Sequence, residues 1–161
     1  MSGSPTVFKR MELKYRLSAV RFRPFLAALR EYAEPDAYGQ YTIGSLYYDT
    51  PAYDLIRASL EKPVYKEKLR LRGYGIPKAS DTVYLELKGE VFKRRVPLPL
   101  ETAARYMRTG EKPHPSCQVL EEIDWFTRCR PLQPAAYLAY DRTALFDRAD
   151  PGVRITFDER I

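Results

Sequence analysis

The strongest pattern in the sequence lies in Tyr65-Lys66-Glu67-Lys68-Leu69-Arg70-Leu71-Arg72-Gly73-Tyr74. Cations and leucines alternate in it, and successive side chains of a β-strand point to opposite faces. The alternation therefore predicts a strand with Leu69 and Leu71 on one face. The other face carries four successive cations, Lys66, Lys68, Arg70 and Arg72. Like charges that neighbour each other on a sheet repel, so this face needs anions beside it.

Two further strands follow in the sequence. Residues 73–81 contain Gly, Pro, Ser and Asp and predict a connection to a strand at Thr82–Lys88. That strand places Glu86 and Lys88 on one face together with Tyr84. A short turn containing Gly89 leads to a third strand at Val91–Val96, which carries Arg94 and Arg95. The three strands predict an antiparallel meander.

Similar patterns extend to both ends of the chain. Residues 8–17 alternate charged and apolar side chains and predict an opening strand with Arg10, Glu12 and Lys14 on one face. Ser18 is a predicted helix N-cap, with Pro24 tolerable in the first turn alone. The other predicted elements are a strand at Tyr41–Asp49, a helix from Asp49-Thr50-Pro51 through Leu60, helices at Leu100–Arg108 and Ser116–Cys129, and strands at Ala136–Phe146 and Val153–Asp158.

Composition narrows the class of protein. The chain has 161 residues, a net charge of +6 and 45% hydrophobic residues, so it can bury a core, and we expect one domain over 7–161. No apolar run approaches the ~20 residues needed to cross a bilayer and no signal peptide is evident, so we expect a cytoplasmic protein without a transmembrane segment. Cys117 and Cys129 show no metal or disulfide spacing. A single histidine, His114, and the lack of GxSxG and HExxH motifs argue against a Ser-His-Asp triad and a histidine-bound zinc, and the common nucleotide-binding loops are absent.

The polar faces of the predicted strands carry mostly cations. If these faces converge in a closed or curled sheet, they line a channel that is tolerable only when water and a polyanion fill it. Arginine predominates, and its planar fork suits bidentate phosphate contacts. The cations in question are Arg10, Lys14, Lys68, Arg70, Arg72, Lys88, Arg94, Arg142 and Arg154. Glu12, Glu86 and Asp158 lie among them and can either orient these cations or hold a divalent ion.

Six segments in order carry a resemblance to a known family. They are Glu12–Tyr15, Ser45–Thr50, Lys68–Arg72, Leu85–Lys88, Tyr140–Ala144 and Val153–Asp158. Together they resemble the VTC catalytic domain, the polyphosphate polymerase domain of the triphosphate tunnel metalloenzyme superfamily. The resemblance covers about residues 7–161. It implies an α+β fold, an antiparallel β-barrel or tunnel with flanking helices.

The resemblance also implies an activity and a set of site residues. It implies an enzyme that transfers the γ-phosphate of ATP to a growing polyphosphate chain, with Mn²⁺ or Mg²⁺ as cofactor and with ATP, polyphosphate or triphosphate as ligands. The implied catalytic cations are Lys14, Lys68, Arg70, Arg72, Lys88, Arg142 and Arg154. Further phosphate-binding residues are Arg10, Lys66, Arg94, Arg95 and Tyr140. The implied metal ligands are Glu12, Glu86 and Asp158.

The sequence departs from the family pattern at two places. The sister CYTH branch opens with ExExK, whereas here Arg10 occupies the first Glu position, which favours the VTC branch. The family continues beyond Asp158 into a further strand and helix, so we expect a truncated domain with impaired activity. Two alternatives stay open: a tripolyphosphate or nucleoside triphosphate hydrolase of the CYTH type, and a non-catalytic module that binds RNA or another polyanion. The net charge of +6 and thirteen tyrosines suit the second, although such a charge is more typical of a plain basic globular protein.

Overall fold

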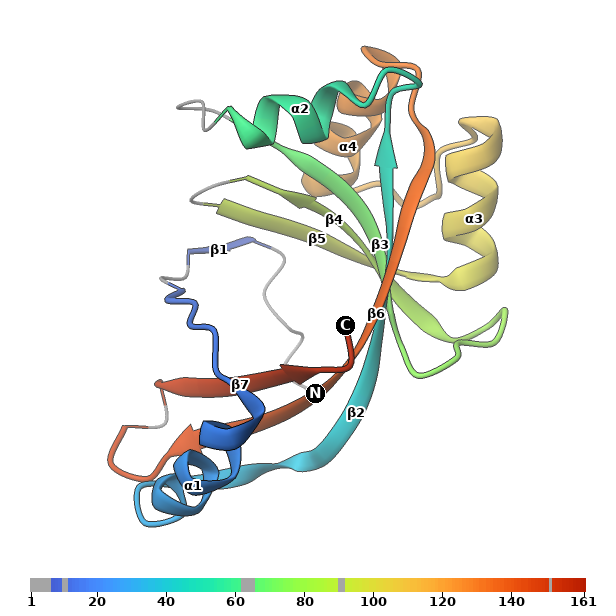
Figure 1. Ribbon diagram of the computed structural model, residues 1–161. Helices are drawn as coiled ribbons and strands as arrows, with labels where there is room; N and C mark the ends of the chain where they lie inside the picture. Colours follow the sequence, from blue (N-terminus) through green and yellow to red (C-terminus); the bar gives the residue numbers. More distant parts are fainter. Residues whose placement is uncertain (1–6, 10–11, 62–65, 90–91, 151) are drawn as a thin grey trace. The chain divides into compact units, whose positions relative to one another are not determined.

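Strands and helices make up most of the chain in Figure 1, a computed structural model that describes residues 7–9, 12–61, 66–89, 92–150 and 152–161. The elements are β1 (Val7–Lys9), α1 (Ala19–Leu29), β2 (Ala33–Asp49), α2 (Asp54–Leu60), β3 (Lys68–Tyr74), β4 (Thr82–Lys88), β5 (Phe92–Pro99), α3 (Leu100–Thr109), α4 (Gln118–Arg128), β6 (Gln133–Asp147) and β7 (Arg154–Glu159). The strands are hydrogen-bonded in the order β1-β5-β4-β3-β2-β6-β7.

The chain divides into two compact units. The first comprises the described residues of Met1–Met11 together with Gly44–Leu138, and the second comprises Glu12–Ile43 and Ala139–Ile161. The long strands β2 and β6 each contribute residues to both units. The single domain expected over 7–161 stays a prediction.

The predicted meander is confirmed in the first unit. β3 pairs antiparallel with β4, with Leu69 opposite Leu87, and β4 pairs antiparallel with β5, with Leu85 opposite Val96. These side chains are buried, and helices α3 and α4 cover them (Figure 1). The core comprises Tyr48, Leu69, Leu71, Val83, Leu85, Leu87, Val96, Ala103, Tyr106, Val119, Leu120, Ile123 and Phe126. One face of the meander is therefore apolar and packed, and its other face is polar.

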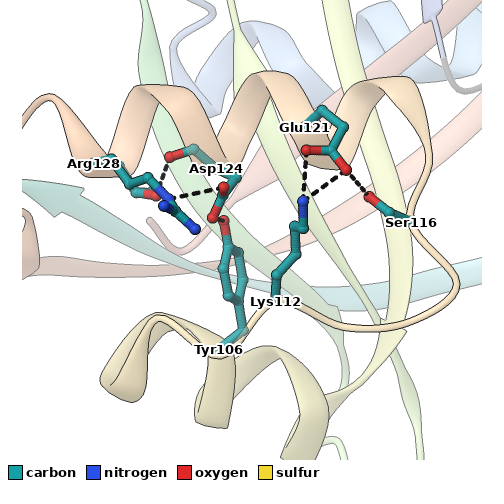
Figure 2. Close-up of polar contacts among 7 residues, drawn as sticks. Tyr106, Lys112, Ser116, Glu121, Asp124 and Arg128 are labelled. Atoms are coloured by element: carbon teal, nitrogen blue, oxygen red, sulfur yellow. Dashed lines mark hydrogen bonds and ion pairs between the residues drawn. The ribbon is translucent and has the colours of Figure 1, made fainter.

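Polar contacts fasten α3 to α4. Figure 2 shows the Tyr106 hydroxyl donating to Asp124 Oδ1 at 3.2 Å, while Arg128 Nε lies 2.9 Å from Asp124 Oδ2. Between the helices, Lys112 Nζ donates to both carboxylate oxygens of Glu121. Burial raises the pKa of Tyr106 to about 12, a shift that the nearby Asp124 carboxylate reinforces. Lys112 and Ser116 hold the pKa of Glu121 below its usual value through hydrogen bonds. The contacts fix the two covering helices on the meander.

The link from β2 to α2 differs from the prediction. Helix α2 begins at Asp54, so Pro51 lies in the preceding turn rather than in the first turn of the helix. The Asp49 carboxylate nevertheless accepts hydrogen bonds from the amides of Leu55 (2.9 Å) and Ile56 (3.0 Å). Amides at a helix start lack partners within the helix, and Asp49 satisfies two of them although it precedes them by six and seven residues.

In the second unit, β6 pairs antiparallel with β7, with Arg142 opposite Asp158. Helix α1 lies along this pair, and the rings of Phe22 and Phe25 meet the ring of Phe157 with centroids 5.3 and 6.1 Å apart. Ser18 is the N-cap residue as predicted, but its side chain makes no capping hydrogen bond. Pro24 lies inside the helix, beyond the first turn, contrary to the expectation.

The predicted opening strand over residues 8–17 is wrong for most of its length. β1 spans Val7–Lys9 and pairs with β5, whereas residues 12–18 have no regular structure. Leu13 and Tyr15 are 70% and 85% exposed, so the apolar side chains of the alternating pattern do not pack into a core. Arg10 and Met11 lie outside the described residues.

The predicted α+β class is confirmed: an antiparallel sheet flanked by helices. Closure of this sheet into a tunnel stays a prediction. Among the described residues, no helix combines the length and apolarity that crossing a bilayer requires.

Candidate functional site

The polar face of the β3–β5 meander carries cations in register across the strands. Lys68 is paired with Lys88, which is paired with Lys93. In the next row on the same face, Arg70 is paired with Glu86, which is paired with Arg95. Two residues further along, Arg72 is opposite Tyr84. We call this surface the basic face; in the described part of β3–β5, Glu86 is its one acidic side chain.

Glu86 organises the centre of the basic face. Its Oε2 accepts from Arg70 Nε at 2.7 Å and lies 3.3 Å from Arg72 Nη2, while Arg70 Nη1 donates to the Tyr47 hydroxyl of β2 at 3.1 Å. The side chains of Arg70 and Glu86 are 8% and 11% exposed. Burial by itself lowers the pKa of Arg70, but attraction and hydrogen bonds to Glu86 and Tyr47 together outweigh it, and the net shift is upward. Arg70 thus stays charged in spite of its burial.

Two polar atoms near this cluster are unsatisfied. Within the described residues, Arg72 Nε and Ser45 Oγ are buried without a hydrogen-bond partner. Alternation along β2 places Ser45 on the same face as Tyr47, and hence on the side of Arg70. Buried polar groups in native proteins are nearly always satisfied, so these atoms point to a further polar group that joins them.

Arg94 does not lie on the basic face, contrary to the expectation. It is opposite Leu87, and its guanidinium pairs with Glu67 and, at 2.9 Å, with Glu122 of α4. Arg94 therefore lies on the helix-covered face, where two carboxylates neutralise it. Arg95 takes the place on the basic face, with its Cζ 5.2 Å from the centre of the Tyr84 ring.

The sequence analysis did not single out Lys93, which lies on the basic face, or Tyr47 of β2, whose hydroxyl accepts from Arg70. Lys93 could have been found from the sequence, because it lies two residues before Arg95 in the strand and therefore on the same face. Tyr47 lies in an aromatic run in which the face of each ring could not be assigned from the sequence.

A second polar cluster lies on β6 and β7 of the second unit. Arg142 donates to both carboxylate oxygens of Asp158, at 2.7 and 2.8 Å, and its Cζ lies 5.3 Å from the Tyr140 ring centre. Burial lowers the pKa of Arg142, but the hydrogen bonds to Asp158 together with attraction to Asp158, Tyr140 and Tyr41 raise it overall. Arg154 Nη2 donates to Asp36 Oδ2 at 2.9 Å. Asp36 belongs to β2, and the sequence analysis missed it. The predicted closing-strand residues are thus together, with their charges largely compensated.

The other predicted site residues lie elsewhere. Lys66 precedes β3 and is half-buried. Glu12 and Lys14 belong to the exposed, irregular segment before α1, and Arg10 is not among the described residues. The strand expected to carry these three residues to the site is not formed at Glu12 and Lys14.

The residues predicted to hold a divalent ion do not fit a resident metal. Of the side chains that the structure describes, no three His, Cys, Asp or Glu are grouped so that they could hold one. Glu86 is bound by two arginines and Asp158 by one, so each carboxylate already has a positive partner. Glu12 lies in the exposed segment. Glu86 and Asp158 therefore act here as partners of arginine.

Comparison with known proteins identifies the family and the fold. The family model described as VTC domain matches residues 9–161. No curated protein matches the chain. Among solved structures, a candidate adenylate cyclase from Vibrio parahaemolyticus is similar at 16% identity and a TM-score of 0.55, covering 97% of this chain and 70% of that one. A candidate adenylate cyclase from Bacillus halodurans is similar at 15% identity and a TM-score of 0.52, covering 97% and 80%. At such identities the likeness shows a shared fold alone.

Proposed function

This chain belongs to the VTC domain family, and from that premise we propose that it is a polyphosphate polymerase whose basic face binds the phosphates. In the proposed reaction, an oxygen of the terminal phosphate of the polymer forms a bond to the γ-phosphorus of ATP. The bond from that phosphorus to the β,γ-bridging oxygen breaks, and ADP leaves. The acceptor is already an oxyanion, so the reaction needs no histidine base.

The observation that carries the proposal is the register of the basic face. Lys68, Lys88 and Lys93 are opposite one another on adjacent strands, and like charges in that position destabilise a sheet. A bound polyanion relieves this repulsion. The unsatisfied Arg72 Nε–H would donate a hydrogen bond to a phosphate oxygen once side chains adjust.

The work of the protein in this reaction is positioning and charge stabilisation. Phosphoryl transfer asks little covalent chemistry of an enzyme, and fixed cations stabilise the charge on the transferred group. Arg70 is held by Glu86 and Tyr47, so its guanidinium is oriented before the substrate arrives. A divalent ion, Mn²⁺ or Mg²⁺, would enter with the nucleotide and neutralise phosphate charge. In the second unit, Arg142 and Arg154 are proposed to bind phosphates as well.

Arg94 and Arg95 offer a matched pair of variants for the test. Both changes, Arg95→Gln and Arg94→Gln, remove one positive charge, but the two side chains lie on opposite faces of β5. We expect Arg95→Gln to weaken binding of inorganic tripolyphosphate by about 10-fold or more, because hydrogen bonds to charged groups contribute about 1.5–3 kcal/mol. Arg94→Gln should leave that affinity nearly unchanged and lower the unfolding temperature. Equal effects of both variants on affinity would contradict the proposal.

The reaction itself is tested by the products formed from ATP in the presence of Mn²⁺ or Mg²⁺. Polymerase activity yields ADP and a polymer that a gel resolves. Release of orthophosphate without polymer would select a hydrolase instead. Cyclic nucleotide with pyrophosphate would indicate a cyclase, the activity named for the two similar structures.

A further inference from the structure

The basic face changes character along its strands. One row consists of the lysines Lys68, Lys88 and Lys93, and the next contains arginines around Glu86. The third row places Arg72 opposite Tyr84, and Tyr74 follows two residues beyond Arg72 on the same face. Rows repeat about every 7 Å along a strand, so Tyr84 lies roughly 14 Å from the lysine row. One end of the face is therefore lined by lysine ammonium groups and the other end by aromatic rings.

The aromatic end forms a compact platform. The rings of Tyr74 and Tyr84 meet edge to face, with centroids 6.1 Å apart and planes at 88°. Arg95 Cζ lies 5.2 Å from the Tyr84 ring centre. Tyr74 is 43% exposed, so the platform is open to solvent at its end of the face. Tyrosine rings and guanidinium planes both stack on flat heterocycles.

We infer that the Tyr74–Tyr84 pair binds the base of a nucleoside triphosphate, whose phosphates then extend over Arg95, Arg72 and Arg70 toward the lysine row. The inference rests on the proposed function and assigns its two substrates to opposite ends of the basic face. A nucleoside triphosphate has a flat ring at one end and its charge at the other, in the same order as the face. Polyphosphate has no ring, and the flexible lysines suit a chain that must move by one unit after each transfer.

Binding of two ligands separates the base from the phosphates. ATP and inorganic tripolyphosphate are titrated calorimetrically into the full chain and into Tyr84→Leu and Tyr74→Leu, which keep apolar volume but remove the ring. Trp125→Leu is the control, since Trp125 is an exposed aromatic residue of α4, on the helix-covered side. We expect each tyrosine variant to lose at least about fivefold in ATP affinity, while its tripolyphosphate affinity changes by less than about twofold.

Each outcome decides between the two claims. If the parent chain binds tripolyphosphate but the tyrosine variants bind ATP as tightly as the parent does, the base platform is refuted and the proposed function stands. If the parent chain binds neither ATP nor tripolyphosphate, the proposed function itself fails. Should Tyr84→Leu melt well below the parent, Tyr74→Leu carries the test, because Tyr74 lies at the exposed end of β3. If the tyrosine variants bind single-stranded RNA more weakly than the parent but bind ATP equally well, the inference is overturned in favour of an RNA-binding surface.

Discussion

Replacing Glu86 by glutamine tests the charge balance of the basic face most directly. The carboxylate lies 2.7 Å from Arg70 and 3.3 Å from Arg72, and the two side chains that form the closer pair are almost completely buried. Removing one member of a buried pair costs about 3–5 kcal/mol, because the other charge is left without compensation. Glutamine still accepts one hydrogen bond, so we expect a loss near 3 kcal/mol at the lower end of that range.

In a chain of this size, 1 kcal/mol corresponds to about 2–4 °C, so Glu86→Gln should lower the unfolding temperature by roughly 6–12 °C. Inorganic tripolyphosphate should reverse part of this loss. A ligand at 100 times its dissociation constant stabilises the folded state by about 2.7 kcal/mol. In the parent chain, phosphate must share Arg70 and Arg72 with Glu86, whereas in the variant both arginines are uncompensated. Tripolyphosphate should therefore raise the unfolding temperature more in the variant than in the parent.

The assay is thermal unfolding with and without tripolyphosphate, with Glu111→Gln as the control. That substitution removes the same charge from a side chain that is 71% exposed and whose contact with Arg105 is 3.9 Å long. Exposed pairs of this kind contribute about 0–1 kcal/mol. If Glu86→Gln and the control melt alike, or if tripolyphosphate stabilises the variant less than the parent, the reasoning about the basic face is wrong.

Two pH-dependent effects follow from the hydrogen bonds of single side chains. Asp141 accepts hydrogen bonds from Thr42 and Arg160, which lower its pKa. These hydrogen bonds stabilise the fold above the ordinary aspartate pKa of about 3.9, and the stabilisation is lost as the pH falls. The unfolding temperature of Asp141→Asn should therefore decline less steeply with acid than that of the parent. Burial raises the pKa of Tyr106 to about 12. Because an unfolded tyrosine ionises near pH 10, stability should fall between about pH 10 and 12. Tyr106→Phe should reduce that fall and remove one late-ionising tyrosine from an ultraviolet titration; an unchanged titration would contradict the assignment.

The meander could be predicted from the sequence because its alternation is strong and its turns are short. The predicted bounds of β4, Thr82 and Lys88, are those observed. The register could not be predicted, since it depends on the turn between β4 and β5. A shift of one residue reverses the face of every side chain, and this is why Arg94 and Arg95 could not be told apart. The pairing of Lys88 with Lys93 decides in favour of Arg95.

Side-chain contacts between residues far apart in the chain could not be predicted from the sequence either. Asp36 follows Pro35 in a stretch that resembles a turn, and its partner Arg154 is 118 residues away. The alternation at residues 12–17 matched a strand pattern, but a strand also needs a neighbour that supplies hydrogen bonds. β1 has such a neighbour for Val7–Lys9, and Leu13 and Tyr15 are exposed instead of buried.

The two faces of the meander differ in their role: one holds the core, and the other is the proposed binding surface. The apolar face packs against α3 and α4 and holds the core, including Leu69, Leu85 and Phe126. Because that packing does not depend on the opposite face, the sheet can keep three lysines in register and an unsatisfied arginine nitrogen there without unfolding. If the basic face binds phosphate as proposed, relief of the repulsion between these cations contributes to the affinity for a polyanion. Glu86 limits this repulsion at the centre and orients Arg70, which would explain a single carboxylate among the described cations of the face.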